Sequence, residues 1–131
     1  ESKVILCESL DYLDIVSAMK HCYFIMTDSG GIQEEAPSLG KPVLILRDTT
    51  ERPEGIDSGT AKLIGTSSKN ILLEAEKLLI DKKIYDEMSK AINPFGDGKA
   101  SERIVKACLN KLKNESNNYW FIEYFQIFSL T

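Results

Sequence analysis

Short apolar runs alternate with segments of helical periodicity along this chain of 131 residues, and the alternation constrains the fold more than any other feature. Four apolar runs indicate buried strands, at residues 4–7, 23–26, 43–46 and 61–64. Helical spacing of apolar side chains follows them, at residues 11–20, 32–39, 68–79, 84–91 and 101–113. Parallel strands need a crossover of about a dozen residues, usually a helix. The predicted fold class is therefore α/β, a Rossmann-like three-layer domain with a mainly parallel sheet.

The chain is predicted to divide into a domain at residues 1–113 and an aromatic-rich extension at residues 114–131. The last helix of the domain is expected to turn its apolar residues inward, namely Ile104, Val105, Cys108, Leu109 and Leu112. Six of the eleven aromatic residues lie between Tyr119 and Phe128, in a segment too short to cross a membrane. Three alternatives are open for the extension: it docks on this domain, it packs on a missing domain or partner, or it is a non-native extension. We favour packing against protein over an interfacial membrane helix.

Charge and cysteine usage narrow the classes of partner. The net charge is −4, and no run of Lys and Arg is present to neutralise phosphates along a duplex, so nucleic acid is not expected as a partner. Cys7, Cys22 and Cys108 have no CxxC spacing and lie among apolar neighbours, which is typical of buried free thiols in a reducing cytoplasm. With only His21 available beside them, no metal site is predicted.

The N-terminus shows no signal peptide and enters a strand-like run without an initiator methionine. We therefore expect a cut inside a longer cytoplasmic protein.

A glycine turn at Thr27–Gly31 follows the second apolar run and opens a helix. In open α/β sheets ligands bind where strands end and helices begin. Gly30 and Gly31 would let the backbone approach a ligand and adopt positive φ, and Ser29 adds a hydroxyl. Free amides at the helix start favour a phosphate. The alternative is a turn that only caps the helix.

Two further polar groups lie near this turn in the predicted sheet. Glu34 and Glu35 follow on the same helix, and because adjacent helical residues point about 100° apart, at most one is expected to face a ligand. Residues 47–59 are predicted to form a polar loop at the same sheet edge. Arg47 and Arg52 in this loop are suited to clamp phosphate oxygens, although a solvated loop with internal salt bridges explains the composition as well.

The run Thr27–Val43, continued through Arg47–Glu54, closely resembles the C-terminal domain of the non-hydrolysing UDP-N-acetylglucosamine 2-epimerases. Gly59–Thr60 with Leu63–Thr66, and Asn93–Gly98, resemble the same family in order and spacing. The resemblance covers roughly residues 1–113 and implies a GT-B architecture, in which two Rossmann-like domains hold a nucleotide sugar between them.

The resemblance also implies roles for individual residues and for the partners of the parent protein. The UDP-binding residues would be Ser29, Gly30 and Gly31 at the diphosphate, Glu35 at the ribose, Arg52 at the diphosphate and cleft, and Leu10 and Ile15 beside the uracil. The parent would be an isomerase that interconverts UDP-GlcNAc and UDP-ManNAc by eliminating and re-adding UDP. It would be a homodimer that binds UDP and UDP-N-acetylhexosamine without a cofactor or metal.

The catalytic acid and base of the family belong to upstream segments, so we expect no catalytic residue in this chain and no activity from it alone. His21 is expected to cap its helix or favour the helix dipole. Two alternatives stay open at this point: the UDP-binding half of a GT-B glycosyltransferase, and a non-catalytic module for UDP binding or association.

Overall fold

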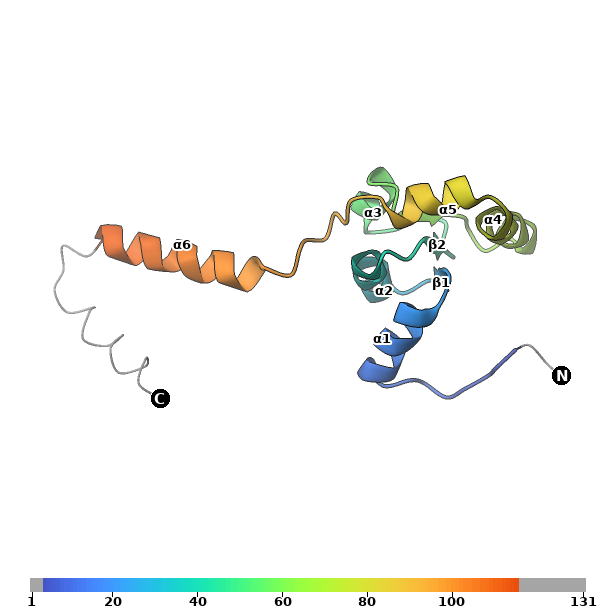
Figure 1. Ribbon diagram of the computed structural model, residues 1–131, viewed down its shortest axis with the longest axis horizontal. Coiled ribbons are helices and arrows are strands. Elements are labelled where there is room, and N and C mark those ends of the chain that lie inside the picture. Colours follow the sequence, from blue (N-terminus) through green and yellow to red (C-terminus); the bar gives the residue numbers. More distant parts are fainter. Residues whose placement is uncertain (1–3, 116–131) are drawn as a thin grey trace. The chain divides into compact units, whose positions relative to one another are not determined.

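The computed structural model describes residues 4–115 and divides the chain into two compact units, Glu1–Phe95 and Gly96–Thr131 (Figure 1). The first unit contains a parallel sheet of three strands in the order β1-β2-β3, with β1 at Ile25–Thr27, β2 at Val43–Ile45 and β3 at Ala61–Leu63. The α/β class with a parallel sheet is therefore confirmed.

The sheet has a core on each face because successive strand residues point in opposite directions. On one face Val43 and Ile45 pack with Met19, Ala36 and Ala61. On the other face Leu44 packs with Ile64 and Leu78. All three residues of β2 are buried, which fits its central position.

Four short helices supply the first face. Helix α1 spans Tyr12–His21, and Asp11 caps it by accepting a hydrogen bond from the Asp14 amide at 3.0 Å. Helix α2 spans Gly30–Glu35 and continues as a 3-10 helix, η1, at Ala36–Leu39. Gly40 ends η1 with φ of 64°, a left-handed conformation that favours glycine. Helix α3 spans Pro53–Asp57.

Helix α3 lies inside the segment predicted to be an irregular loop. Pro53 stands at its first position, where the missing proline amide costs no helical hydrogen bond. Its Gly55 is buried, and a Cβ there would lie 3.4 Å from Ala61 Cβ, so α3 packs close to β3. The loop prediction is wrong for these residues because packing against the sheet stabilises a helix too short to be recognised from periodicity.

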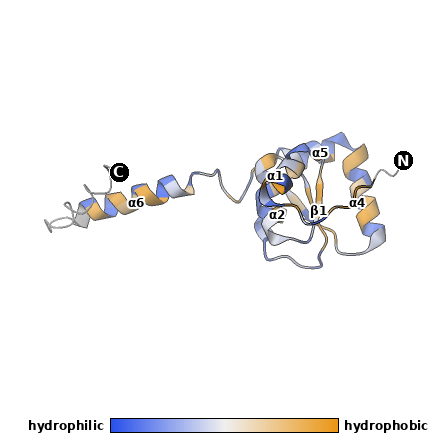
Figure 2. Ribbon diagram, turned by 90° about the horizontal axis from the view of Figure 1, so that it is seen from below, coloured by the Kyte–Doolittle hydropathy of each residue, from blue (hydrophilic) through white to orange (hydrophobic). Residues whose placement is uncertain are grey.

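Helix α4 at Ser68–Ile80 and helix α5 at Lys82–Ser89 supply the second face. Leu78 of α4 is 1% exposed, whereas Leu72, Leu79 and Ile80 of the same helix are exposed. Figure 2 shows hydrophobic and hydrophilic bands alternating along α4. Helix α4 therefore buries the face that carries Leu78 and leaves most of its other large apolar side chains exposed.

The N-terminal apolar run is not the buried strand predicted from the sequence. Residues 4–10 have no regular structure, and Ile5 is 89% exposed. A strand is stabilised by pairing with a neighbour, and β1 pairs only with β2 among the described residues. Cys7 is consequently exposed, which corrects the expectation of a buried thiol.

Cys22 is half-buried, and burial raises the pKa of its thiol above the usual value.

The second unit contains helix α6 at Ala100–Glu115. Asp97, just before it, accepts two hydrogen bonds from Arg103, at 2.8 and 2.7 Å. Ile104, Val105, Cys108 and Leu109 are exposed and Leu112 is half-buried, so within this unit the helix does not bury the apolar side chains that were predicted to point inward. The physical reason is that an apolar stripe is buried only where a second element covers it, and no other described helix or strand belongs to this unit.

The prediction for the aromatic segment at Tyr119–Phe128 lies outside the described residues, and the domain boundary at residue 113 stays a prediction. No helix within residues 4–115 is long and apolar enough to span a membrane.

Candidate functional site at the carboxyl edge of the sheet

The glycine turn lies where β1 ends, as its position in the sequence predicts. Thr27 ends the strand and accepts a hydrogen bond at its Oγ1 from the Ser29 amide, at 3.0 Å. Ser29 precedes α2 in extended conformation, and its side chain makes no capping hydrogen bond there. The first amides of a helix have no acceptor within the helix. Among the described contacts, the amides of Gly30 and Gly31 have no acceptor elsewhere either.

The two glycines differ from expectation in their backbone conformation. Neither Gly30 nor Gly31 has a positive φ, because both lie within α2. Close approach is what makes glycine useful here. A Cβ placed on Gly30 would lie 3.8 Å from Arg52 Nη2 and 3.8 Å from Glu51 Oε1. The turn therefore opens onto an arginine and a carboxylate rather than being sealed beneath other side chains.

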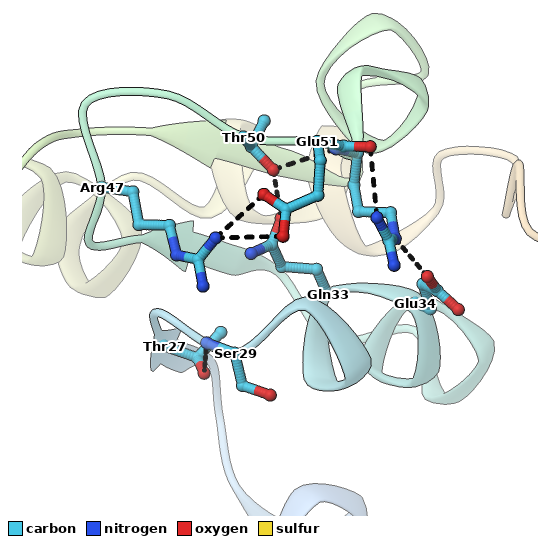
Figure 3. Close-up of polar contacts among 8 residues, drawn as sticks. Thr27, Ser29, Gln33, Glu34, Arg47, Thr50 and Glu51 are labelled. Atoms are coloured by element: carbon cyan, nitrogen blue, oxygen red, sulfur yellow. Dashed lines mark hydrogen bonds and ion pairs between the residues drawn. The ribbon is translucent and has the colours of Figure 1, made fainter.

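The loop that follows β2 carries these charged groups and is tied to α2 (Figure 3). Thr50 Oγ1 donates to Gln33 Oε1 at 2.7 Å and accepts from the Arg52 amide at 3.1 Å. Arg52 Nε donates to Glu34 Oε1. Two successive residues of α2 thus hold the loop.

Arg47 belongs to the same cluster, and its Nη1 donates to both carboxylate oxygens of Glu51, at 3.2 and 2.9 Å (Figure 3). The internal salt bridges weighed for this loop are therefore present alongside the open turn. A hydrogen bond from its own amide, followed by the bond from Arg47, holds the pKa of Glu51 below its usual value.

Arg52 keeps one end of its guanidinium directed at the turn. Nε donates to Glu34, and Nη1 donates to the Glu51 carbonyl at 3.3 Å, while Nη2 is the arginine atom nearest the Cβ position of Gly30. The hydrogen bond to Glu34 raises the pKa of Arg52, so the guanidinium stays charged. A fixed cation beside open helix amides is an arrangement that attracts an oxyanion.

The other predicted site residues lie at the surface. Leu10 is 41% exposed and precedes α1, and Ile15 is half-buried within α1. Glu35 is exposed at the end of α2. The structure therefore brings Arg52 to Gly30, and the assignments of Leu10, Ile15 and Glu35 stay predictions.

Glu34 and Glu35 lie in different surroundings, because Glu34 pairs with Arg52 whereas Glu35 is exposed. His21 likewise has a local role: its Nδ1 lies 2.8 Å from the Ser17 carbonyl oxygen within α1.

Sequence reasoning missed Gln33 and Thr50. Gln33 is 1% exposed and Thr50 half-buried, although both residue types are usually found at the surface. The only sequence signal is spacing, because Gln33 lies three residues, about one helical turn, after Gly30. Within the described residues, no group of three or more His, Cys, Asp or Glu is arranged to hold a metal ion.

The parallel sheet carries the glycine turn and the arginine-bearing loop at the carboxyl ends of adjacent strands. This arrangement defines a Rossmann-like α/β domain with a polar cluster at the edge where open α/β sheets commonly bind ligands. The sequence profile described as UDP-N-acetylglucosamine 2-epimerase matches residues 1–109. The chain belongs to this family, which confirms the resemblance found in its motifs.

Named relatives agree with this assignment. The UDP-N-acetylglucosamine 2-epimerase of Campylobacter jejuni is 50% identical over 115 residues, which cover 88% of this chain and 30% of the relative. The S. aureus MnaA-UDP co-structure is 55% identical with a TM-score of 0.76, over 82% of this chain and 30% of that protein. The structure of UDP-GlcNAc 2-epimerase from Neisseria meningitidis bound to UDP-GlcNAc is 49% identical with a TM-score of 0.76. The match covers 79% of this chain and 28% of that protein. The chain thus spans about 30% of the length of these relatives.

Proposed function

We propose that this chain is the UDP-holding, C-terminal part of a UDP-N-acetylglucosamine 2-epimerase. The observation that carries the proposal is the approach of the Arg52 guanidinium to Gly30, whose amide and that of Gly31 are open at the start of α2. Relatives solved with UDP and with UDP-GlcNAc share this fold at about half sequence identity.

In this proposal the diphosphate binds at the glycine turn. The amides of Gly30 and Gly31 and the hydroxyl of Ser29 donate to phosphate oxygens, and Arg52 Nη2 adds a charged donor. Glu35 accepts from the ribose hydroxyls, and Leu10 and Ile15 contact the uracil. The positive end of the helix dipole and the arginine together offset part of the negative charge of the diphosphate.

The proposed reaction removes the C2 proton of the sugar, breaks the C1–O bond to UDP and re-adds UDP after the proton returns on the opposite face. Negative charge builds up on the diphosphate as the C1–O bond breaks, and donors placed beforehand at that position stabilise it. This chain supplies those donors. The base and acid that move the C2 proton belong to an upstream domain of a cytoplasmic, homodimeric parent, so the chain alone binds UDP without turning over.

Isothermal titration calorimetry of the 131-residue chain with UDP tests the binding step. Saturable heat is expected, and its absence at millimolar UDP would remove the site from this chain.

A second experiment tests the reaction. The chain is joined to the upstream part of the Campylobacter jejuni relative, and the product formed from UDP-GlcNAc is identified by NMR. Inversion at C2 is expected, and sugar transfer without inversion would favour a glycosyltransferase instead.

A further inference from the structure

Gln33 has an unusual set of contacts for a buried side chain. Its side chain is directed from α2 toward the loop that carries Thr50 (Figure 3), and its Oε1 accepts from Thr50 Oγ1 at 2.7 Å. Its Nε2 is buried and has no hydrogen-bond partner among the described residues. A buried donor without a partner costs stability, so an apolar residue of similar size would serve the fold at least as well. An amide at this position therefore calls for a role other than stability.

The contacts of Thr50 indicate that role. Thr50 uses one hydroxyl for two bonds, donating to Gln33 and accepting from the Arg52 amide at 3.1 Å. Because the Gln33 carbonyl takes the hydroxyl proton, the oxygen lone pairs of Thr50 are left to face the Arg52 amide. Arg52 is then held at its backbone through Thr50 and at its side chain by Glu34.

The same helix carries both halves of the proposed phosphate site. Gly30 opens α2, and Gln33 lies three residues later, about one turn along it. Gln33 therefore ties the arginine loop to the helix whose first amides face the ligand. We infer that Gln33 is a positioning residue that sets the location of Arg52 over the glycine turn through Thr50. This inference rests on the proposed function for its ligand, but the Gln33–Thr50–Arg52 contact itself exists without one.

Three variants of the 131-residue chain separate positioning from structural support. Gln33→Met keeps the side-chain length and removes both amide groups. Thr50→Val keeps the shape and removes the hydroxyl, and Thr50→Ser is the matched control that keeps it. Melting temperatures establish that each variant is folded, and the Thr50 pair, in the half-buried loop, still decides the question if Gln33→Met fails to fold.

The first readout is amide hydrogen exchange at Arg52 without ligand. Exchange is expected to rise at least about threefold in Gln33→Met and Thr50→Val, because loss of a structural hydrogen bond raises local opening, and to stay near wild type in Thr50→Ser. Unchanged exchange in Gln33→Met and Thr50→Val would overturn the inference whether or not the chain binds UDP.

The second readout compares UDP with uridine by calorimetry. Loss of one well-placed charged contact corresponds to about tenfold in affinity. We expect that loss for UDP in Gln33→Met and Thr50→Val and much less for uridine, which has no diphosphate to meet Arg52. Equal losses for both ligands would overturn the positioning role. A wild-type chain that binds neither ligand would reject the proposed function, and amide exchange alone would then decide the role of Gln33.

Discussion

Two polar clusters near the sheet differ in whether their polar groups all have partners within the protein. On α4, Glu74 is 14% exposed at its side chain and accepts from Lys62 at 2.6 Å and Lys77 at 2.8 Å. On α2, Gln33 is more deeply buried and keeps an unpaired amide. The Glu74 cluster is complete because its carboxylate is paired within the protein, whereas the Gln33 cluster at the carboxyl edge is incomplete because one buried amide donor has no partner among the described residues.

The largest effect is expected from a substitution in the apolar core beneath α4, the helix that carries Glu74. Leu78 is 1% exposed in the core between α4 and the sheet, so Leu78→Ala should lower the free energy of unfolding by about 2–5 kcal/mol through lost burial and an unfilled cavity. Urea denaturation measures it, with exposed Leu79→Ala as the matched control. A midpoint equal to wild type would show that this face of the sheet is not a packed core.

The next largest effect is expected from a substitution at the carboxyl edge of the sheet, where the Gln33 cluster lies. Gly30→Val should weaken UDP binding by roughly 100-fold, on the order of two good charge-assisted hydrogen bonds, because the branched side chain fills the approach to the turn. Stability should change little, since the added Cβ meets its nearest atoms at ordinary contact distance. Calorimetry and thermal melts measure the two quantities. Ser68→Val, at the first position of α4, is the matched control and should bind UDP normally.

Arg52→Ala should have a smaller and more selective effect. UDP binding should weaken by about tenfold, as for one charged hydrogen bond, while uridine binding should change much less. Parallel titrations with both ligands measure the ratio, and Lys69→Ala on exposed α4 serves as the charge-matched control. Equal losses for UDP and uridine would count against a diphosphate contact.

The smallest expected effect is on the free energy of unfolding at acidic pH, through the Glu74 cluster. Hydrogen bonds from Lys62 and then from Lys77 hold the pKa of Glu74 below its usual value. The contribution is therefore present above the unfolded pKa of about 4.3 and is lost as the pH falls through the folded value. Glu74→Gln should cost about 1 kcal/mol or less at neutral pH, because both lysines are partly exposed, and should flatten the acid limb of stability. Denaturation midpoints from pH 3 to pH 7 measure this, and an unchanged acid limb would contradict the pairing.

The sequence by itself determined the local part of this structure. Apolar period and turn residues are properties of a few neighbouring positions, which is why three of the four predicted strands, the α/β class and the glycine turn at the end of β1 were all predictable. The motif of Thr27–Val43 likewise determined the family, confirmed over residues 1–109.

Only the tertiary structure decided which segments meet. The bond between Gln33 and Thr50 joins residues 17 apart, and the pair of Glu34 with Arg52 joins residues 18 apart. Both depend on β1 and β2 lying side by side, so that their carboxyl ends carry α2 and the arginine loop to one edge. The exposure of residues 4–7 was decided the same way: their apolar pattern predicts a strand, but a strand is buried only where neighbouring elements pair with it and cover it.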